Sequence, residues 1–98
     1  MDVRLIAFLA LFSFPALALD GPAWVVDGDT IVIGRERVRI QNFNAPELHQ
    51  PGGPEAKARM QALTLGKEVH CDGKARDRYG RLVARCSVNG RDLGQAMR

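Results

Sequence analysis

An almost unbroken apolar run, Leu5–Phe14, lies near the start of this 98-residue chain. The run follows the cation Arg4 and ends at Pro15, and Ala16–Ala18 then supplies the small-residue pattern of a signal-peptide cleavage site. The apolar stretch is shorter than the roughly 20 residues that a membrane-spanning helix needs. We therefore expect residues 1–18 to be a signal peptide, with an uncleaved membrane anchor as the alternative.

Cleavage after Ala18 would leave residues 19–98, enough for one small domain with no stable membrane span. A domain of about 80 residues has a small core and gains from a cross-link. Cys71 and Cys86 are the two cysteines, and an even number in a short exported chain favours a disulfide. A metal site that also uses His70 is the alternative, although the C-x-x-C spacing typical of such sites is missing. We expect a periplasmic or extracellular protein.

Short segments with β-strand character fill much of the expected domain. β-Branched residues and alternation of apolar with polar side chains predict strands at 23–26, 30–33, 37–41, 68–71 and 82–88. In the third of these, Val38 and Ile40 share one face and two Arg share the other, which indicates a cationic outer face. Cys71 and Cys86 fall on the apolar sides of neighbouring strands, as a cross-strand disulfide requires.

One good helix is expected, over Pro54–Leu65, after a loop at 44–53. Proline is favoured at the first helical position, and Gly66 is well placed to end the helix. The apolar stripe of this helix is Ala56, Met60 and Leu63. A second helix should begin near Leu93 with Asp92 as its N-cap. Strands with one inserted helix predict a mainly β, α+β domain that forms a closed or nearly closed barrel.

Three polar segments concentrate the chemistry. Asp27–Thr30 places two carboxylates on a tight turn, which suits a hard cation such as Ca²⁺ or Mg²⁺ but is also common in ordinary hairpins. Arg39–Glu47 (RIQNFNAPE) offers a cation, amides and a carboxylate. Lys74–Arg85 (KARDRYGRLVAR) surrounds Tyr79 with Arg, which suits a phosphate backbone beside a base or sugar, the alternative being a solvated hairpin tip.

Taken together, VVDGDT, RVRIQNFNAPE, GPEAKARM and DRYGRLVA resemble the staphylococcal nuclease (thermonuclease) family in order and spacing, from about Trp24 to Arg98. The resemblance implies an OB-fold-like, five-stranded β-barrel that hydrolyses phosphodiester bonds of DNA and RNA with Ca²⁺. Members of the family extend the helix near Leu93 and add another helix. We therefore expect this chain to be a C-terminally truncated member, and a monomer.

The resemblance also implies a set of metal-binding residues. Asp29 would be a direct Ca²⁺ ligand, the backbone carbonyl of Ala45 would be another, and Asp27 would support the ion through water. Asn44 falls where the family has a ligand carboxylate. An amide oxygen still coordinates Ca²⁺, but one negative charge is lost, so we expect weaker binding.

The implied reaction depends on Glu47, which would position or deprotonate the attacking water, and on Arg39 and Arg81, which would hold the scissile phosphate. Tyr79 would hold a neighbouring phosphate together with Arg78, which stands in place of the usual Lys. The leading hypothesis is therefore an exported, Ca²⁺-dependent nuclease. The alternative is a catalytically weak or inactive OB-like module that binds nucleic acid or another anionic polymer. The neutral side chain of Asn44 supports this alternative.

Charge is compatible with either function. The net charge is +3, which does not indicate a polyanion-binding tail, but 11 of the 14 basic residues are Arg. Arg makes forked contacts with phosphate. The predominance of Arg over Lys, rather than the net charge, therefore indicates an anionic partner.

Overall fold

The computed structural model describes residues 17–98, which form a mainly β domain with two helices. Seven strands are present: β1 (Leu17–Gly21), β2 (Ala23–Asp27), β3 (Thr30–Ile33), β4 (Glu36–Ile40), β5 (Val69–Arg76), β6 (Leu82–Val88) and β7 (Arg91–Asp92). The helices are α2 (Gly53–Thr64) and α3 (Leu93–Met97). The predicted α+β, OB-like class is confirmed.

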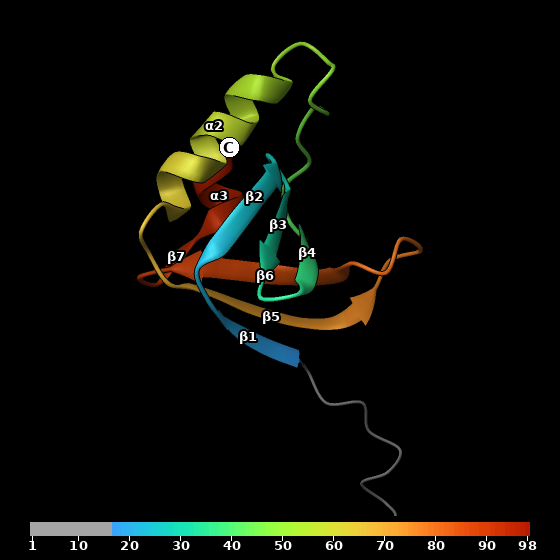
Figure 1. Cartoon of the computed structure of the whole chain (residues 1–98), viewed down its shortest axis with the longest axis vertical. Coiled ribbons are helices and arrows are strands. Elements are labelled where there is room, and N and C mark those ends of the chain that lie inside the picture. Colours follow the sequence, from blue (N-terminus) through green and yellow to red (C-terminus); the bar gives the residue numbers. More distant parts are fainter. Residues whose placement is uncertain (1–16) are drawn as a thin grey trace, which may run out of the picture.

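All strands belong to one sheet, in the order β1-β5-β6-β4-β3-β2, with β7 paired to β6. Neighbours on this path are antiparallel except β4 and β6, which run parallel. The sheet curls into a half-barrel, with β1 on the side away from α2 (Figure 1). The five predicted strands are present, and β1 and β7 extend the sheet beyond them.

The longest strand was predicted too short. A strand was expected at 68–71, whereas β5 runs from Val69 to Arg76 and stays paired with β6 across a register shift at Gly73–Ala75. The polar residues after Cys71 hid this extension, because their side chains face solvent while the backbone remains in the ladder. The predicted charged connection is therefore shorter than expected and carries Tyr79 at its tip.

The predicted signal peptide falls mostly on residues 1–16, which lie outside the described residues. Leu17 and Ala18 belong to β1, opposite Gly73 and Asp72 of β5. The predicted cleavage point after Ala18 thus lies within β1. Cleavage there would leave the pairs that join residues 19–21 to β5.

The core lies between the curled sheet and the helices. It consists of the buried apolar side chains of Val25, Ile31, Ile33, Val38, Ile40, Met60, Val69, Leu82, Ala84, Val88, Leu93 and Met97. Cys71 and Cys86 lie in the same core, directly opposite each other on β5 and β6, and form a disulfide. The predicted cross-strand disulfide is confirmed. Disulfides persist in oxidising, extracytoplasmic compartments, which fits such a location for this chain.

Helix α2 agrees with its prediction to within one residue at each end, stopping before Gly66. Met60 is buried, and Ala56 and Leu63 pack against the core, so the predicted apolar stripe faces inward. Figure 1 shows α2 lying beside β2 and α3, which closes one end of the half-barrel. The predicted cap of α3 is also present, since the Asp92 carboxylate accepts a 2.9 Å hydrogen bond from the Gln95 backbone. Within residues 17–98, none of the helices has the length and apolar character to cross a membrane.

Candidate active site

The turn between β2 and β3 brings two carboxylates to the rim of the half-barrel. Asp29 is buried, and its Oδ1 accepts a 3.1 Å hydrogen bond from the Thr30 hydroxyl. Asp27 is part-exposed, and its Oδ1 accepts a 3.2 Å bond from the Asp29 backbone N–H. A register shift between Val25 and Asp27 bends β2 at this point, which re-aims the side chains that follow.

Gly28, at the centre of the turn, allows close packing against the next part of the site. A Cβ at this position would lie 2.7 Å from the Cβ atoms of both Ala45 and Ala56. The hydrogen atom of glycine lets the turn contact both the loop after β4 and helix α2. Across this contact the Ala45 N–H donates a 2.9 Å hydrogen bond to Asp29 Oδ2.

Arg39, on β4, links the same carboxylate to the loop. Its Nη2 donates to Asn44 Oδ1 at 2.9 Å and lies 3.5 Å from Asp29 Oδ2. Its Nη1 donates to the backbone carbonyls of Ile40 and Phe43, the second at 2.7 Å. These contacts fix the guanidinium between β4 and the loop.

Arg81 approaches from the other side, on the turn between β5 and β6. Its Nε lies 2.7 Å from Asp77 Oδ2, and its Nη1 donates a 3.1 Å hydrogen bond to the Thr30 hydroxyl. The Arg78 guanidinium carbon lies 5.0 Å from the centre of the exposed Tyr79 ring, and that of Arg81 lies 5.3 Å from it. The turn is thus ordered by an ion pair and by cation–π contacts.

Glu47 is held through its backbone rather than its side chain. Its N–H donates a 2.8 Å bond to Gln50 Oε1, and Gly53 packs so closely that a Cβ there would lie 2.0 Å from the Glu47 carbonyl oxygen. The carboxylate itself is 72% exposed, with Oε1 3.8 Å from His49 Nδ1. It therefore remains available to water or to a ligand.

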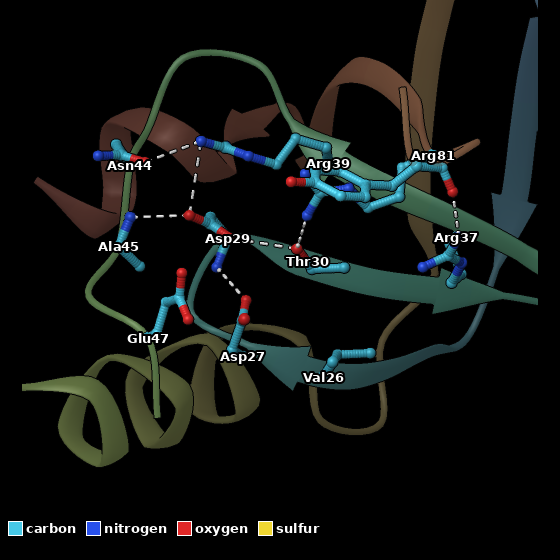
Figure 2. Close-up of a pocket in the computed structure, with 11 residues that line it drawn as sticks. Val26, Asp27, Asp29, Thr30, Arg37, Arg39, Asn44, Ala45, Glu47 and Arg81 are labelled. Carbon is cyan, nitrogen blue, oxygen red and sulfur yellow. Dashed lines mark hydrogen bonds and ion pairs between the residues drawn. The ribbon is translucent and has the colours of Figure 1, made fainter. Parts of the chain in front are cut away.

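One pocket of about 470 Å³ brings these groups together (Figure 2). Eight of the predicted site residues line it: Asp27, Asp29, Arg39, Asn44, Ala45, Glu47, Tyr79 and Arg81. Figure 2 shows the carboxylates of Asp27, Asp29 and Glu47 grouped on one side, and Arg39 reaching toward Asn44. Arg78 is not among the lining residues and instead stacks on Tyr79.

Three lining residues were not predicted: Val26, Thr30 and Arg37. Arg37 donates to the Tyr79 carbonyl and so joins β4 to the turn between β5 and β6. Its alternation with Val38 already indicated that it shares a face with Arg39. That signal alone does not single out Arg37, because strand alternation does not show which turn or loop a side chain contacts.

In and beside the pocket, the environment shifts the pKa of two carboxyl groups in opposite directions. Burial, followed by the hydrogen bond and charge of Asp29, raises the pKa of Asp27. Burial also opposes ionisation of Asp77, but hydrogen bonds from the Arg81 backbone and side chain outweigh it and lower the pKa of Asp77. The neighbouring carboxylates of Asp27 and Asp29 therefore favour a bound cation, whereas Asp77 already forms an ion pair with Arg81.

The donor set suits a hard cation. Among residues 17–98, no three Asp, Glu, His or Cys side chains converge in a way that would hold a metal, so any ion here would also need amide or backbone oxygens. Asp29 Oδ2 and Asn44 Oδ1 already converge on one positive group, the Arg39 guanidinium. Carboxylate, amide and backbone carbonyl oxygens are the ligands that Ca²⁺ accepts. The residues present therefore fit Ca²⁺, the ion that the resemblance to the staphylococcal nuclease family implies, and an Asn44 ligand would add no charge.

Comparison with known proteins agrees with the fold. The family described as Staphylococcal nuclease homologue matches residues 37–98. The fold and pocket define an OB-like, mainly β class of protein. The chain belongs to the staphylococcal nuclease family within that class.

Several curated relatives resemble most of this chain. It is 36% identical to a micrococcal nuclease of Shigella flexneri, over 85% of this chain and 55% of the relative. It is 38% identical to an uncharacterized endonuclease of Escherichia coli O157:H7, over 91% and 63%. It is 37% identical to the succinoglycan biosynthesis protein ExoI of Rhizobium meliloti, over 76% and 46%. The chain thus spans about half to two thirds of the length of these relatives.

Proposed function

We propose that this chain is an exported, Ca²⁺-dependent nuclease that hydrolyses phosphodiester bonds of DNA or RNA. The observation that carries the proposal is the convergence of Asp29, Glu47, Arg39 and Arg81 in one pocket. A site that only binds an anion does not need an exposed carboxylate, such as that of Glu47, beside two Arg side chains. A hydrolase does, because water must lose a proton as it attacks.

Arg39 and Arg81 would bind the non-bridging oxygens of the scissile phosphate from two sides. The planar fork of Arg contacts two oxygens at once and stabilises the negative charge that builds up in the transition state. The Phe43 carbonyl already fixes Arg39, and Asp77 fixes Arg81, so both guanidinium groups are positioned before substrate binds.

Glu47 would accept the proton of the attacking water. The water oxygen then forms the new bond to phosphorus, and the bond to the 5′-oxygen breaks, which leaves the 3′-phosphate end typical of the family. The departing oxygen keeps the bonding electron pair and takes a proton from solvent. Ca²⁺ held by Asp29, Asn44 and the Ala45 carbonyl, with Asp27 acting through water, would supply positive charge beside the phosphate. Tyr79 and Arg78 would contact a neighbouring phosphate.

A binding module is the second candidate, and one observation favours it. Asn44 is neutral, and its Oδ1 accepts from Arg39 at the position where a metal ligand is expected. A site with one fewer negative charge binds Ca²⁺ more weakly. The pocket would then bind a nucleic acid or another anionic polymer without cleaving it.

Cleavage of single-stranded DNA by the purified, oxidised protein tests the proposal, with calcium and then with a chelator. Glu47→Gln should lower the rate by about 10²–10⁴-fold and Arg81→Ala by about 10²–10³-fold. Glu55→Gln and Arg85→Ala are matched controls, since both change exposed residues outside the pocket.

The outcomes separate the two candidates. Calcium-dependent cutting that both pocket variants lose, and that both controls keep, supports the nuclease. A folded protein that binds DNA without cutting it overturns the nuclease in favour of the binding module.

A further inference from the structure

Trp24, the one tryptophan of the chain, lies on the outer face of β2 and is 75% exposed. Its neighbour Val25 points into the core, so the exposed position of the indole follows from strand alternation. β2 ends the strand path of the sheet. A large aromatic side chain left outside the core, on an edge strand, contributes little to folding and is available to a ligand.

Strand register places Trp24 beside the pocket. Trp24 is opposite Val32 on β3, and Val32 is opposite Arg37 on β4, so the three form one row across the outer face. The next row toward the rim holds Thr30 and Arg39. Arg37, Thr30 and Arg39 all line the pocket, which therefore lies on the same face of the sheet as Trp24.

The row combines an aromatic face with a cation. Arg37 has five N–H donors, and its bond to the Tyr79 carbonyl leaves others for a phosphate. Bases of single-stranded nucleic acid can stack on aromatic side chains, whereas the faces of paired bases in a duplex are covered by their neighbours. Tyr79, also exposed, lies across the pocket on the turn between β5 and β6.

We propose that Trp24 is a base-stacking subsite for single-stranded nucleic acid, with Arg37 binding the phosphate next to the stacked base. This inference rests on the proposed function, since it takes the pocket to hold a nucleic-acid strand. The strand would cross the outer face from Tyr79 past Arg37 to Trp24. The subsite would favour single strands over duplex and would act on binding rather than on the chemical step.

Because Trp24 is the one tryptophan, its fluorescence reports on this site directly. Oligothymidylate titrated into the oxidised protein in the presence of a calcium chelator should quench the emission to saturation, without cleavage. A duplex of matched length should quench less. Polyphosphate, which has charge but no bases, should compete for the cations without the same quenching.

Variants supply the second readout. Trp24→Ala should weaken binding of a dye-labelled single strand, followed by anisotropy, by roughly fivefold or more. Trp24→Phe keeps a π-face and should recover most of the affinity, and polyphosphate binding should be unchanged in both. Leu65→Ala is the control, because Leu65 is exposed at the end of α2 and outside the pocket. With calcium present, Trp24→Ala should raise KM for the single strand and leave kcat unchanged.

The results distinguish this inference from the proposed function. Cleavage with unquenched emission, and with equal affinity in Trp24→Ala, overturns the subsite and leaves the nuclease standing. Quenching and weakened binding without cleavage keep the subsite and remove the nuclease. Emission that is blue-shifted in the free protein and shifts red on dilution would mean that a second copy covers Trp24, which also overturns the subsite.

Discussion

At the scale of single residues, the neutral amide of Asn44 leaves the candidate metal site with one negative charge fewer than a carboxylate would give it. Its oxygen and that of Asp29 both face the Arg39 guanidinium, at 2.9 and 3.5 Å from Nη2. In the proposed Ca²⁺ site, the cation would share these oxygens with Arg39. The charge of the ligands therefore decides how well a cation competes.

Asn44→Asp should tighten Ca²⁺ binding, on the order of tenfold, because ligand charge is one of the properties that set calcium affinity. Calorimetric titration of the two proteins measures the difference. Asn89→Asp makes the same charge change at an exposed turn outside the pocket and should have little effect. Equal or weaker binding by the Asn44→Asp variant would show that Asn44 is not a ligand.

Gly28 is the residue that lets the carboxylate turn contact the loop after β4. A methyl group there would lie 2.7 Å from the Cβ atoms of Ala45 and Ala56, neither of which can rotate away. Gly28→Ala should therefore displace the turn, cost about 1–3 kcal/mol of stability and weaken Ca²⁺ binding. Denaturant unfolding and calcium titration measure the two effects.

A rescue variant tests the reason for the Gly28 effect. Gly28→Ala combined with Ala45→Gly removes one of the two clashing methyl groups and should recover part of both losses, since neighbouring substitutions couple. If the double variant is worse than the sum of the single ones, the close packing is not the cause. Unchanged stability in Gly28→Ala alone would exclude the clash directly.

At the scale of elements, β1 is held to β5 by a charged cluster around His70. His70 Nδ1 lies 2.6 Å from Asp20 Oδ1 on β1, and its Nε2 lies 2.8 Å from Asp72 Oδ2 on β5. The hydrogen bond to Asp20, then that to Asp72, raises the pKa of His70. The protonated ring can donate to both carboxylates at once, which the neutral ring cannot.

The sign of the pH effect follows from the raised pKa. The contribution of His70 to stability is fully present below the unfolded value of about 6.5 and is lost as pH rises through the folded pKa. His70→Gln should thus melt below the wild type at about pH 6, and the difference in Tm should shrink by about pH 9. Thermal unfolding across this range measures it. His49→Gln, on an exposed loop, is the control, and a gap that is constant with pH would contradict the mechanism.

Elements with a local signal could be predicted from the sequence, whereas those made by pairing could not. Helix α2 was predicted from Pro54 and its apolar stripe, and β4 from strict alternation. β1 was missed because residues 17–21 gain their strand conformation from β5, a partner some 50 positions away. The same limit applies to the pocket. Motif residues such as Asp29 and Glu47 could be proposed from the sequence, whereas Arg37 joins the pocket through a contact with Tyr79 that only the fold creates.

At the scale of the whole molecule, the half-barrel assembles the pocket from three separate segments: the β2–β3 hairpin around its turn, β4 with the loop that follows it, and the turn between β5 and β6. The parallel pairing of β4 with β6 is central to this. It places Val38 opposite Leu82 and Arg39 opposite Val83, so Arg81 reaches Thr30 on β3. Any change that loosens β5 and β6 from the rest therefore reaches the site.

The Cys71–Cys86 disulfide joins β5 to β6 at a sequence separation of 15, and the loop that it closes includes Arg78, Tyr79 and Arg81. Loop-closure entropy predicts a contribution of about 3 kcal/mol for a segment of this length. In a domain of this size each kcal/mol shifts Tm by about 4–8 °C. The double substitution Cys71→Ala and Cys86→Ala should therefore lower Tm by roughly 10–20 °C, measured by circular dichroism.

Reductant provides the internal control for this prediction. It should lower the Tm of the wild type toward that of the double variant and leave the variant itself unchanged. Both cysteines are buried, so reduction should proceed mainly through unfolded molecules and should speed up near the transition. The double variant could instead have the same Tm as the oxidised wild type. That result would mean that packing between β5 and β6, rather than the covalent link, keeps the turn with Arg81 against the pocket.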